Sequence, residues 1–251
     1  FWRTGSDNAT YRHRVYYSTS GTAWTNWTPN SSMYNVSAWA TDGTNYVMTS
    51  FSGANNYAFI SSSTSKFGTY TTARTSDIGE FRDVTWSTSA AKFIAVGHGQ
   101  QILWSTSGVT WNTAAHSSAG DFISILDNGS TLVAVGFKSS TPNTRTNNFA
   151  RSTDGVTWTA FDIQQTANAN NHVDKITNVV TGNGIDSNNA NKGQNNAWVY
   201  KGYFYVRDAF GNLNISSDGI NWNALTMPYW TGGVVTTPYA WYAYSLSLIH
   251  I

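Results

Sequence analysis

The chain has 251 residues, of which 11% are charged and 15% aromatic, with a formal net charge of +1 and no cysteine. So little charge, against roughly 25% in an average domain, argues against nucleic-acid binding, which needs a basic stripe to displace counterions. The lack of cysteine excludes disulfides and Cys-based zinc sites, and no apolar run reaches the length of a membrane span. We therefore expect one domain with no nucleic-acid partner, no membrane insertion and no metal or other cofactor.

A seven-residue motif recurs five times along the chain, at a period of roughly 40–50 residues that is typical of solenoids and propellers. The best copy, from Ser152 to Trp158, reads Ser-Thr-Asp-Gly-Val-Thr-Trp, and the most degraded one runs from Ser61 to Phe67. In chain order, the residues that define the copies are Ser18, Ser20, Gly21 and Trp24; Ser61, Ser63 and Phe67; Ser105, Ser107, Gly108 and Trp111; Ser152, Asp154, Gly155 and Trp158; and Ser216, Asp218, Gly219 and Trp222. We expect these residues to be determinants of the fold.

Each copy has the chemistry of a tight turn between two strands. The carboxylate of Asp154 can accept hydrogen bonds from backbone N–H groups two residues further on, and Ser107 can do the same more weakly. Glycine after the polar residue can take a positive φ without a Cβ penalty. In the degraded copy Thr64 stands at the glycine position, so we expect that turn to differ in geometry.

The motif Ser-x-Asp-Gly-x-Thr-Trp resembles the Asp-box, or BNR repeat, of sialidase-like β-propellers. The resemblance implies an all-β fold of four-stranded antiparallel blades, with each box at the turn between the third and fourth strands. It also implies that the boxes lie on the rim opposite the ligand face. The alternating strands and glycine-containing turns between the boxes fit this plan.

Taken in order, the chain predicts an incomplete ring within a single domain over residues 1–245. The expected parts are a partial blade at 1–28, blades at about 29–72, 73–115, 116–162 and 163–226, and the start of a further blade at 227–245. Residues 246–251 are expected to be a non-native tail. Two alternatives follow: the native ring has six or more blades, or Val234–Thr237 supplies the inner strand that the first blade lacks and closes five.

In a propeller, the loops from second to third strand, and from fourth to the next first strand, gather on one face. The residues that we expect to bind a ligand there are His98, Gln100, Lys138, Arg145, Trp198, Arg207, Asp208 and Phe210. Sugars are bound by aromatic faces with a few well-placed polar groups. The alternative for Trp198 is packing between blades, and for Lys138 and Arg145 simple solvation.

Catalytic signatures are weak. A sialidase would imply an arginine triad, a Tyr nucleophile, an assisting Glu and an acid/base Asp, yet Glu80 is the only glutamate and an Arg-Ile-Pro start is absent. The five histidines have no metal-ligand spacing. We identify no catalytic residue.

Our leading hypothesis is a non-catalytic binding or adhesion propeller of a surface-exposed, secreted or phage-virion protein, directed at glycans. Its ligand would be a glycan or a protein on one face, and the chain would be part of a larger chain or assembly. The alternatives are a fragment of an exo-sialidase-like glycosidase and a structural propeller without a small ligand. The expected location is extracellular, at a cell surface or on a virion.

Overall fold

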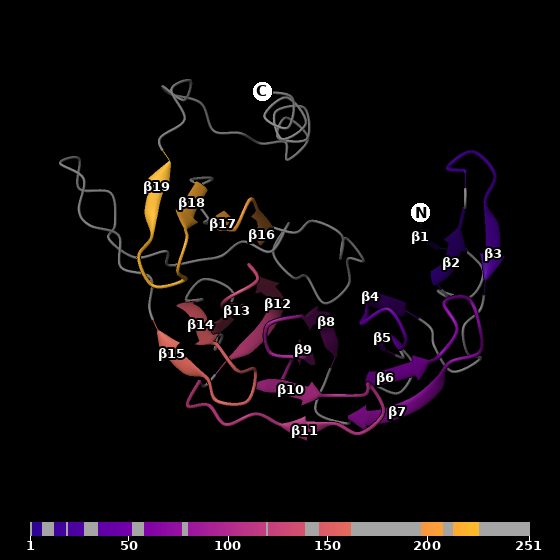
Figure 1. Ribbon diagram of the computed structural model, residues 1–251, viewed down its shortest axis with the longest axis horizontal. Helices are drawn as coiled ribbons and strands as arrows, with labels where there is room; N and C mark the ends of the chain where they lie inside the picture. The colour runs from indigo at the N-terminus through magenta and orange to yellow at the C-terminus, as the bar shows by residue number, and fades with distance from the viewer. Residues whose placement is uncertain are drawn as a thin grey trace.

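In the computed structural model, the described part of the chain forms nineteen strands in five antiparallel sheets (Figure 1). The structure describes residues 2–6, 13–18, 20–27, 35–51, 58–76, 80–118, 120–138, 146–161, 197–207 and 213–225. Within these ranges there is no helix, and so none long and apolar enough to cross a membrane. The expectations for 227–245, for Val234–Thr237 and for the tail at 246–251 concern residues outside these ranges.

The sheets follow one another along the chain, and within each sheet the strands pair in sequence order. Sheet I contains β1 (Trp2–Ser6), β2 (His13–Tyr17) and β3 (Thr25–Trp27), and sheet II contains β4 (Asn35–Thr41), β5 (Tyr46–Phe51), β6 (Ala58–Ser63) and β7 (Thr71–Ser76). Sheet III contains β8 (Phe81–Ser87), β9 (Lys92–Gly97), β10 (Gln101–Ser105) and β11 (Asn112–Thr113). Sheet IV contains β12 (Asp121–Asp127), β13 (Leu132–Lys138), β14 (Thr146–Ser152) and β15 (Thr159–Phe161), and sheet V contains β16 (Ala197–Tyr200), β17 (Tyr203–Arg207), β18 (Leu213–Ser216) and β19 (Asn223–Leu225).

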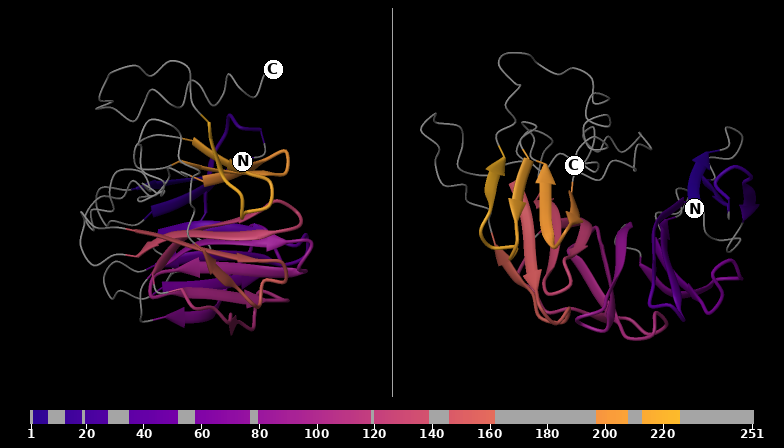
Figure 2. Two further views of the ribbon diagram at one scale, coloured as in Figure 1. Left: turned by 90° about the vertical axis from the view of Figure 1, so that its left-hand side faces the viewer. Right: turned by 45° about the horizontal axis from the view of Figure 1, so that its top comes forward.

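The five sheets stand side by side in an open arc, from sheet I to sheet V (Figures 1 and 2). Strands β4, β8, β12 and β16 line its inner side, and each contacts the next. Because the strands alternate in direction, the first hairpin and the turn after the third strand lie at one rim. The connection from second to third strand, and the link to the next sheet, lie at the other rim.

The core lies between the sheets rather than at the centre of the arc. Ile94 and Ile102 of sheet III, for example, pack against Phe122, Leu132 and Trp158 of sheet IV. Four of these five side chains are at most 1% exposed, and Trp158 is 3% exposed. Burying a side chain of this size is worth about 1.5–3 kcal/mol, so sheet-to-sheet packing holds the arc together.

The seven-residue motif forms the turn between third and fourth strands in sheets III, IV and V, and the turn between β2 and β3 in the three-stranded sheet I. In sheet IV, Ser152 Oγ accepts hydrogen bonds from the N–H groups of Asp154 and Gly155, at 3.2 and 2.9 Å. Asp154 Oδ1 in turn accepts from the N–H groups of Val156 and Thr157, at 2.8 and 2.9 Å. Gly155 has a φ of 72°. The turn therefore satisfies its own backbone, as the sequence predicts.

In sheet II the motif is shifted by two residues from the predicted register. The first position pairs with the second strand as Phe93↔Ser105 in sheet III, and the equivalent pair in sheet II is Tyr46↔Ser63. Ser63 Oγ accepts from Ser65 N–H at 3.1 Å, a bond that a serine at the first or the third position can make, so the register with β5 decides. Ser61 is instead a strand residue, and its buried hydroxyl has no partner in the described part of the chain.

The predicted aromatic of that copy is also corrected. The turn is one residue longer than the others, and Tyr70, 1% exposed, takes the buried aromatic position. Phe67 stacks on Tyr17 of sheet I, with ring centroids 3.9 Å apart. The run Ser61–Ser63 offers several serines for the first position, and only the register of β5 with β6 decides among them.

Candidate functional site

A β-bulge recurs at the start of three inner strands. The register shifts between Val36 and Ala38 in β4, between Phe81 and Asp83 in β8, and between Phe122 and Ser124 in β12. The extra residues are Ser37, Arg82 and Ile123. A bulge re-aims the side chain that it carries, so the same backbone feature presents a different group from each sheet at this rim.

Glycines face two of these bulges. A Cβ on Gly97 would overlap Glu80 O, and a Cβ on Gly136 would overlap Asp121 O. The chain that enters the inner strand therefore passes against the second strand with no room for a side chain. This close approach places Glu80 and Asp121 at the rim, beside the connection from second to third strand.

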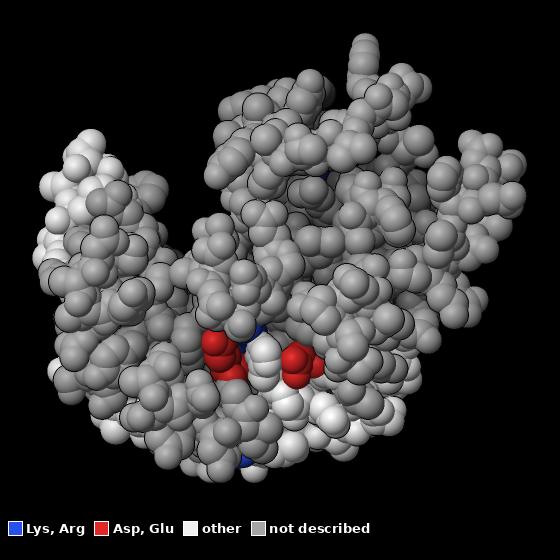
Figure 3. All heavy atoms as spheres, turned by 180° about the vertical axis from the view of Figure 1, so that it is seen from behind, with Lys and Arg blue, Asp and Glu red and all other residues white. Residues whose placement is uncertain are grey.

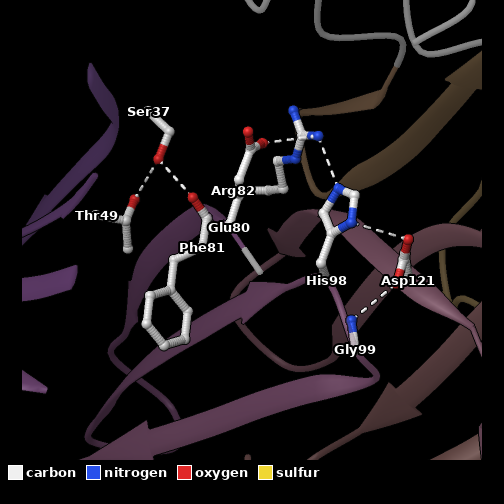
Figure 4. A network of polar contacts seen from close by, with 8 residues as sticks. All are labelled: Ser37, Thr49, Glu80, Phe81, Arg82, His98, Gly99 and Asp121. Atoms are coloured by element: carbon white, nitrogen blue, oxygen red, sulfur yellow. Dashed lines mark hydrogen bonds and ion pairs between the residues drawn. The ribbon is translucent and has the colours of Figure 1, made fainter. Parts of the chain in front are cut away.

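Arg82 is the centre of a polar network at that rim (Figure 4). Its Nη2 lies 2.8 Å from Glu80 Oε2 and 2.7 Å from His98 Nε2. On the other side of the imidazole, His98 Nδ1 lies 3.1 Å from Asp121 Oδ2. Gly99 N–H donates to Asp121 Oδ1 at 2.8 Å. We call Glu80, Arg82, His98 and Asp121 the rim network; it joins sheets III and IV.

The geometry determines the proton position on His98. A guanidinium has only donors, so Arg82 donates to His98 Nε2, which must carry a lone pair. The proton of the neutral ring then sits on Nδ1 and points at Asp121. The two contacts thus fit the Nδ1–H tautomer of the neutral ring, which joins Arg82 to Asp121.

The network is only partly shielded from solvent. The side chains of Glu80, His98 and Asp121 are 26%, 28% and 26% exposed, whereas that of Arg82 is 13% exposed. Burial lowers the pKa of Arg82 from its ordinary value, and the charges of Glu80 and Asp121 oppose that effect. In the view from behind, described acidic side chains reach the surface in two patches with basic atoms between them (Figure 3).

A second polar group continues the rim toward sheet II. Ser37, the bulge residue of β4, donates to Phe81 O at 2.8 Å and lies 2.9 Å from Thr49 Oγ1 (Figure 4). Ser37 thus joins the inner strand of sheet II to that of sheet III. The polar rim spans three successive sheets.

Of the eight residues predicted to bind a ligand, the structure places His98 in the rim network. Gln100 is exposed in the same connection, with a φ of 65°, and Trp198 lies on a face of sheet V, stacked on Tyr205. Lys138 and Arg207 end β13 and β17 at this rim, but their side chains are not described. Arg145, Asp208 and Phe210 lie outside the described residues.

Three members of the rim network were not among the residues predicted to bind a ligand: Glu80, Arg82 and Asp121. One signal was available, because Glu80 is the only glutamate of the chain and stands two residues from an arginine. Within the described ranges, no three His, Asp or Glu side chains are grouped so that they could hold a metal ion. The site is thus a hydrogen-bonding surface of mixed charge.

Comparisons with known proteins identify the architecture. No protein-family model matches the chain, and neither does any curated protein. Among solved structures, a GH74 enzyme from Niastella koreensis is similar, with 18% identity, 90% of this chain and 30% of that chain covered, and a TM-score of 0.50. The fold is a β-propeller.

Other propeller structures are similar at lower TM-scores. A putative exo-beta-1,3-galactanase from Bifidobacterium bifidum shares 10% identity over 92% of this chain and 89% of that chain, with a TM-score of 0.46. YCF48 bound to D1 peptide shares 12% identity over 89% and 84%, with a TM-score of 0.44. This propeller chain spans 64% of the matched chain from a nidogen/laminin complex and 30% of the GH74 enzyme. Propellers of this kind include enzymes and non-enzymes, so the likeness shows the fold alone.

Proposed function

We propose that this propeller is a non-catalytic glycan-binding module and that its ligand contacts the rim network. The observation that carries the proposal is the cluster of Glu80, Arg82, His98 and Asp121 at one rim, with three of the four side chains about a quarter exposed. Carboxylates accept hydrogen bonds from sugar hydroxyls, and the guanidinium has further N–H groups that can donate, while His98 positions Arg82 and Asp121. A few convergent polar groups of this kind are what fixes the orientation of a small ligand.

Membership of the Asp-box repeat group is part of the proposal. The turns of sheets IV and V make the serine and aspartate hydrogen bonds that the motif led us to expect. They lie at the rim opposite Arg82 and His98. In this proposal, the rim with the turns is structural and the rim with Arg82 and His98 binds the ligand. Together with the low charge of the chain, this favours an adhesive module of a secreted protein, a cell surface or a virion.

Sialidase-like hydrolysis is the second candidate, and the contact between Glu80 and Arg82 bears directly on it. In a sialidase, arginines bind the substrate carboxylate. Here Arg82 Nη2 already contacts Glu80 and His98, which weakens its pull on a second anion. This arrangement favours binding of neutral sugars over hydrolysis of acidic ones.

The test is a glycan array, followed by calorimetric titration with the best glycan. Arg82→Met and His98→Ala should each weaken binding by at least about tenfold, since each removes a hydrogen bond to a charged or coupled group. Lys201→Gln and Ser130→Ala, exposed positions at the opposite rim, serve as controls and should bind as the unaltered chain does.

Two results would contradict this proposal. A chain that binds no glycan but retains a protein neighbour would favour the structural propeller. Release of a fluorophore from a sialoside, lost in Arg82→Met, would favour the glycosidase.

A further inference from the structure

His98 lies between a cation and an anion in the rim network. Arg82 Nη2 donates to its Nε2 at 2.7 Å, and its Nδ1 lies 3.1 Å from Asp121 Oδ2 (Figure 4). Only the neutral ring can accept the first of these hydrogen bonds, because a protonated imidazole is a donor at both nitrogens. A proton on Nε2 therefore breaks the contact with Arg82 and leaves the contact with Asp121 in place.

The net charge of the rim network depends on that proton. With His98 neutral, the carboxylates of Glu80 and Asp121 accompany one guanidinium, so the network carries one net negative charge. Protonation of His98 brings the net charge to zero. The side chains of Glu80, His98 and Asp121 are each about a quarter exposed, so a ligand at this rim is close enough to respond to the change.

Arg82 uses only part of its donor capacity in the described contacts. The contacts with Glu80 and His98 both involve Nη2, and the buried Nε has no hydrogen-bond partner in the described ranges. A guanidinium has five N–H donors in a planar fork that fits the two oxygens of a carboxylate. Loss of the contact with His98 frees one more of these donors. Protonation of His98 thus removes negative charge and releases a donor at the same place.

Two further groups near this boundary between sheets titrate, and a test has to separate them from His98. Asp83, next to Arg82 in β8, accepts hydrogen bonds from sheet IV, and burial raises its pKa to about 6. His116 lies between β11 and β12, and burial lowers its pKa from the ordinary value. Substitution of each group in turn shows which of the three changes binding.

We propose that protonation of His98 switches the ligand class of the rim network, from neutral glycans at neutral pH to carboxylate-bearing glycans at acidic pH. This inference rests on the proposed glycan-binding function and adds its regulation. At neutral pH the network repels a ligand carboxylate, and His98 occupies Arg82. Once a histidine is protonated, below its ordinary pKa of about 6.5, the net charge is gone and Arg82 can pair with the carboxylate. A neutral glycan has no charge through which to respond.

The test is calorimetric titration at about pH 8 and about pH 5, the limits of the range in which histidine titrates. The two ligands are the best neutral glycan of the array and the same glycan with its terminal primary hydroxyl oxidised to a carboxylate. That carboxylate stays ionised at the lower pH, because the pKa of such an acid is about 3–4. Relative to the neutral glycan, the acidic one should gain on the order of tenfold in affinity at the lower pH, the effect of one unit charge about 10 Å away near a protein surface.

His98→Gln is the decisive variant. The glutamine amide can accept from Arg82 and donate to Asp121, as the neutral ring does, but it takes up no proton in this range. The gain in relative affinity at the lower pH should therefore disappear. Asp83→Asn and His116→Gln are the controls; each removes one of the other titrating groups, and the gain should remain in both.

Nitrogen NMR of the histidine rings follows the switch without any ligand. His98 Nε2 should be unprotonated at the higher pH and protonated at the lower one. Asp121→Asn should move the midpoint of this titration to lower pH, because it removes the anion that stabilises the protonated ring. A His98 ring whose protonation is the same at both pH values would overturn the switch even where glycans bind.

The binding outcomes separate this inference from the proposed function. Binding of the neutral glycan, with a relative affinity for the acidic one that is the same at both pH values, would overturn the switch alone. An equal gain in His98→Gln would do the same. A chain that binds no glycan at either pH would overturn the proposed function and the switch together.

Discussion

Asp83 of sheet III accepts a hydrogen bond of 3.0 Å from Ser124 Oγ of sheet IV, across the boundary between two blades. The same carboxylate oxygen accepts from Ile125 N–H at 2.9 Å, and Oδ1 accepts from Val84 N–H at 2.9 Å. Although the residue as a whole is only partly buried, its carboxyl group is enclosed between the sheets, and this burial raises its pKa to about 6. The three hydrogen bonds oppose the shift without cancelling it. An interface between blades therefore carries a titrating group.

Asp83 should make the stability of the propeller depend on pH. Its folded-state pKa of about 6 exceeds the ordinary value of 3.8, so its contribution is fully present below 3.8 and is lost as pH rises through 6. Relative to Asp83→Asn, which keeps the shape, the unaltered chain should lose up to about 3 kcal/mol across that window. Urea unfolding of both proteins on either side of the window measures the difference. Parallel pH profiles would show that the carboxyl group is not the cause.

Asp218 should act in the opposite direction. Its pKa is lowered to about 2; burial alone would raise it, but hydrogen bonds from Ile220, Asn221 and Ser216 outweigh that effect. Its contribution is therefore present above the ordinary value of 3.8 and is lost as pH falls through about 2. By analogy with helix caps, Asp218→Ala should cost about 1 kcal/mol at neutral pH.

Asp218→Ser is the matched variant for that experiment. It copies sheet III, where Ser107 Oγ accepts from Val109 N–H at 3.3 Å. In thermal unfolding, Asp218→Ser should be more stable than Asp218→Ala and less stable than the unaltered chain. Equal stability of the two variants would mean that the side chain does not support the turn.

Gly155→Ala should be far more costly than Gly129→Ala. Both glycines have a positive φ, 72° and 93°, so both substitutions carry a backbone strain of about 1–2 kcal/mol. Only at position 155 would the new Cβ also meet Ile94 Cδ1, and such overpacking adds about 1–3 kcal/mol. The difference between the denaturant midpoints of Gly155→Ala and Gly129→Ala measures the cost of overpacking. Equal losses would mean that sheet III yields to the added methyl group.

Trp111→Phe should cost more than Trp222→Phe. Trp111 Nε1–H donates to Gly108 O at 2.9 Å, whereas the buried Nε1 of Trp222 has no partner in the described ranges. Both side chains are nearly buried, at 7% and 4% exposure. Because the loss of ring area is the same, the difference should be about 1 kcal/mol, the net worth of a hydrogen bond. Calorimetry of the two variants tests it, and a larger loss at position 222 would contradict the assignment.

Local chemistry allowed the repeat to be predicted from the sequence. The hydrogen bonds from Gly155 to Ser152 and from Val156 to Asp154 join residues two or three apart, so the motif contains both partners. The positive φ of Gly155 and the aromatic residue that follows also belong to the motif itself, so both could be expected from it. Turn, strand order and sheet type therefore follow from the spacing of small, polar and aromatic residues.

The tertiary structure alone decided the rest, since it concerns partners far apart in the chain. Arg82 meets His98 only because β8 and β9 pair with a bulge, and His98 meets Asp121 only because sheets III and IV stand side by side. Likewise, the pairing Tyr46↔Ser63 selected one serine among several similar ones. Trp198 stacks on Tyr205 because the register of β16 with β17 places the two residues opposite each other. Sequence spacing specifies contacts within a turn, whereas strand register and sheet packing specify which side chains from different sheets come together.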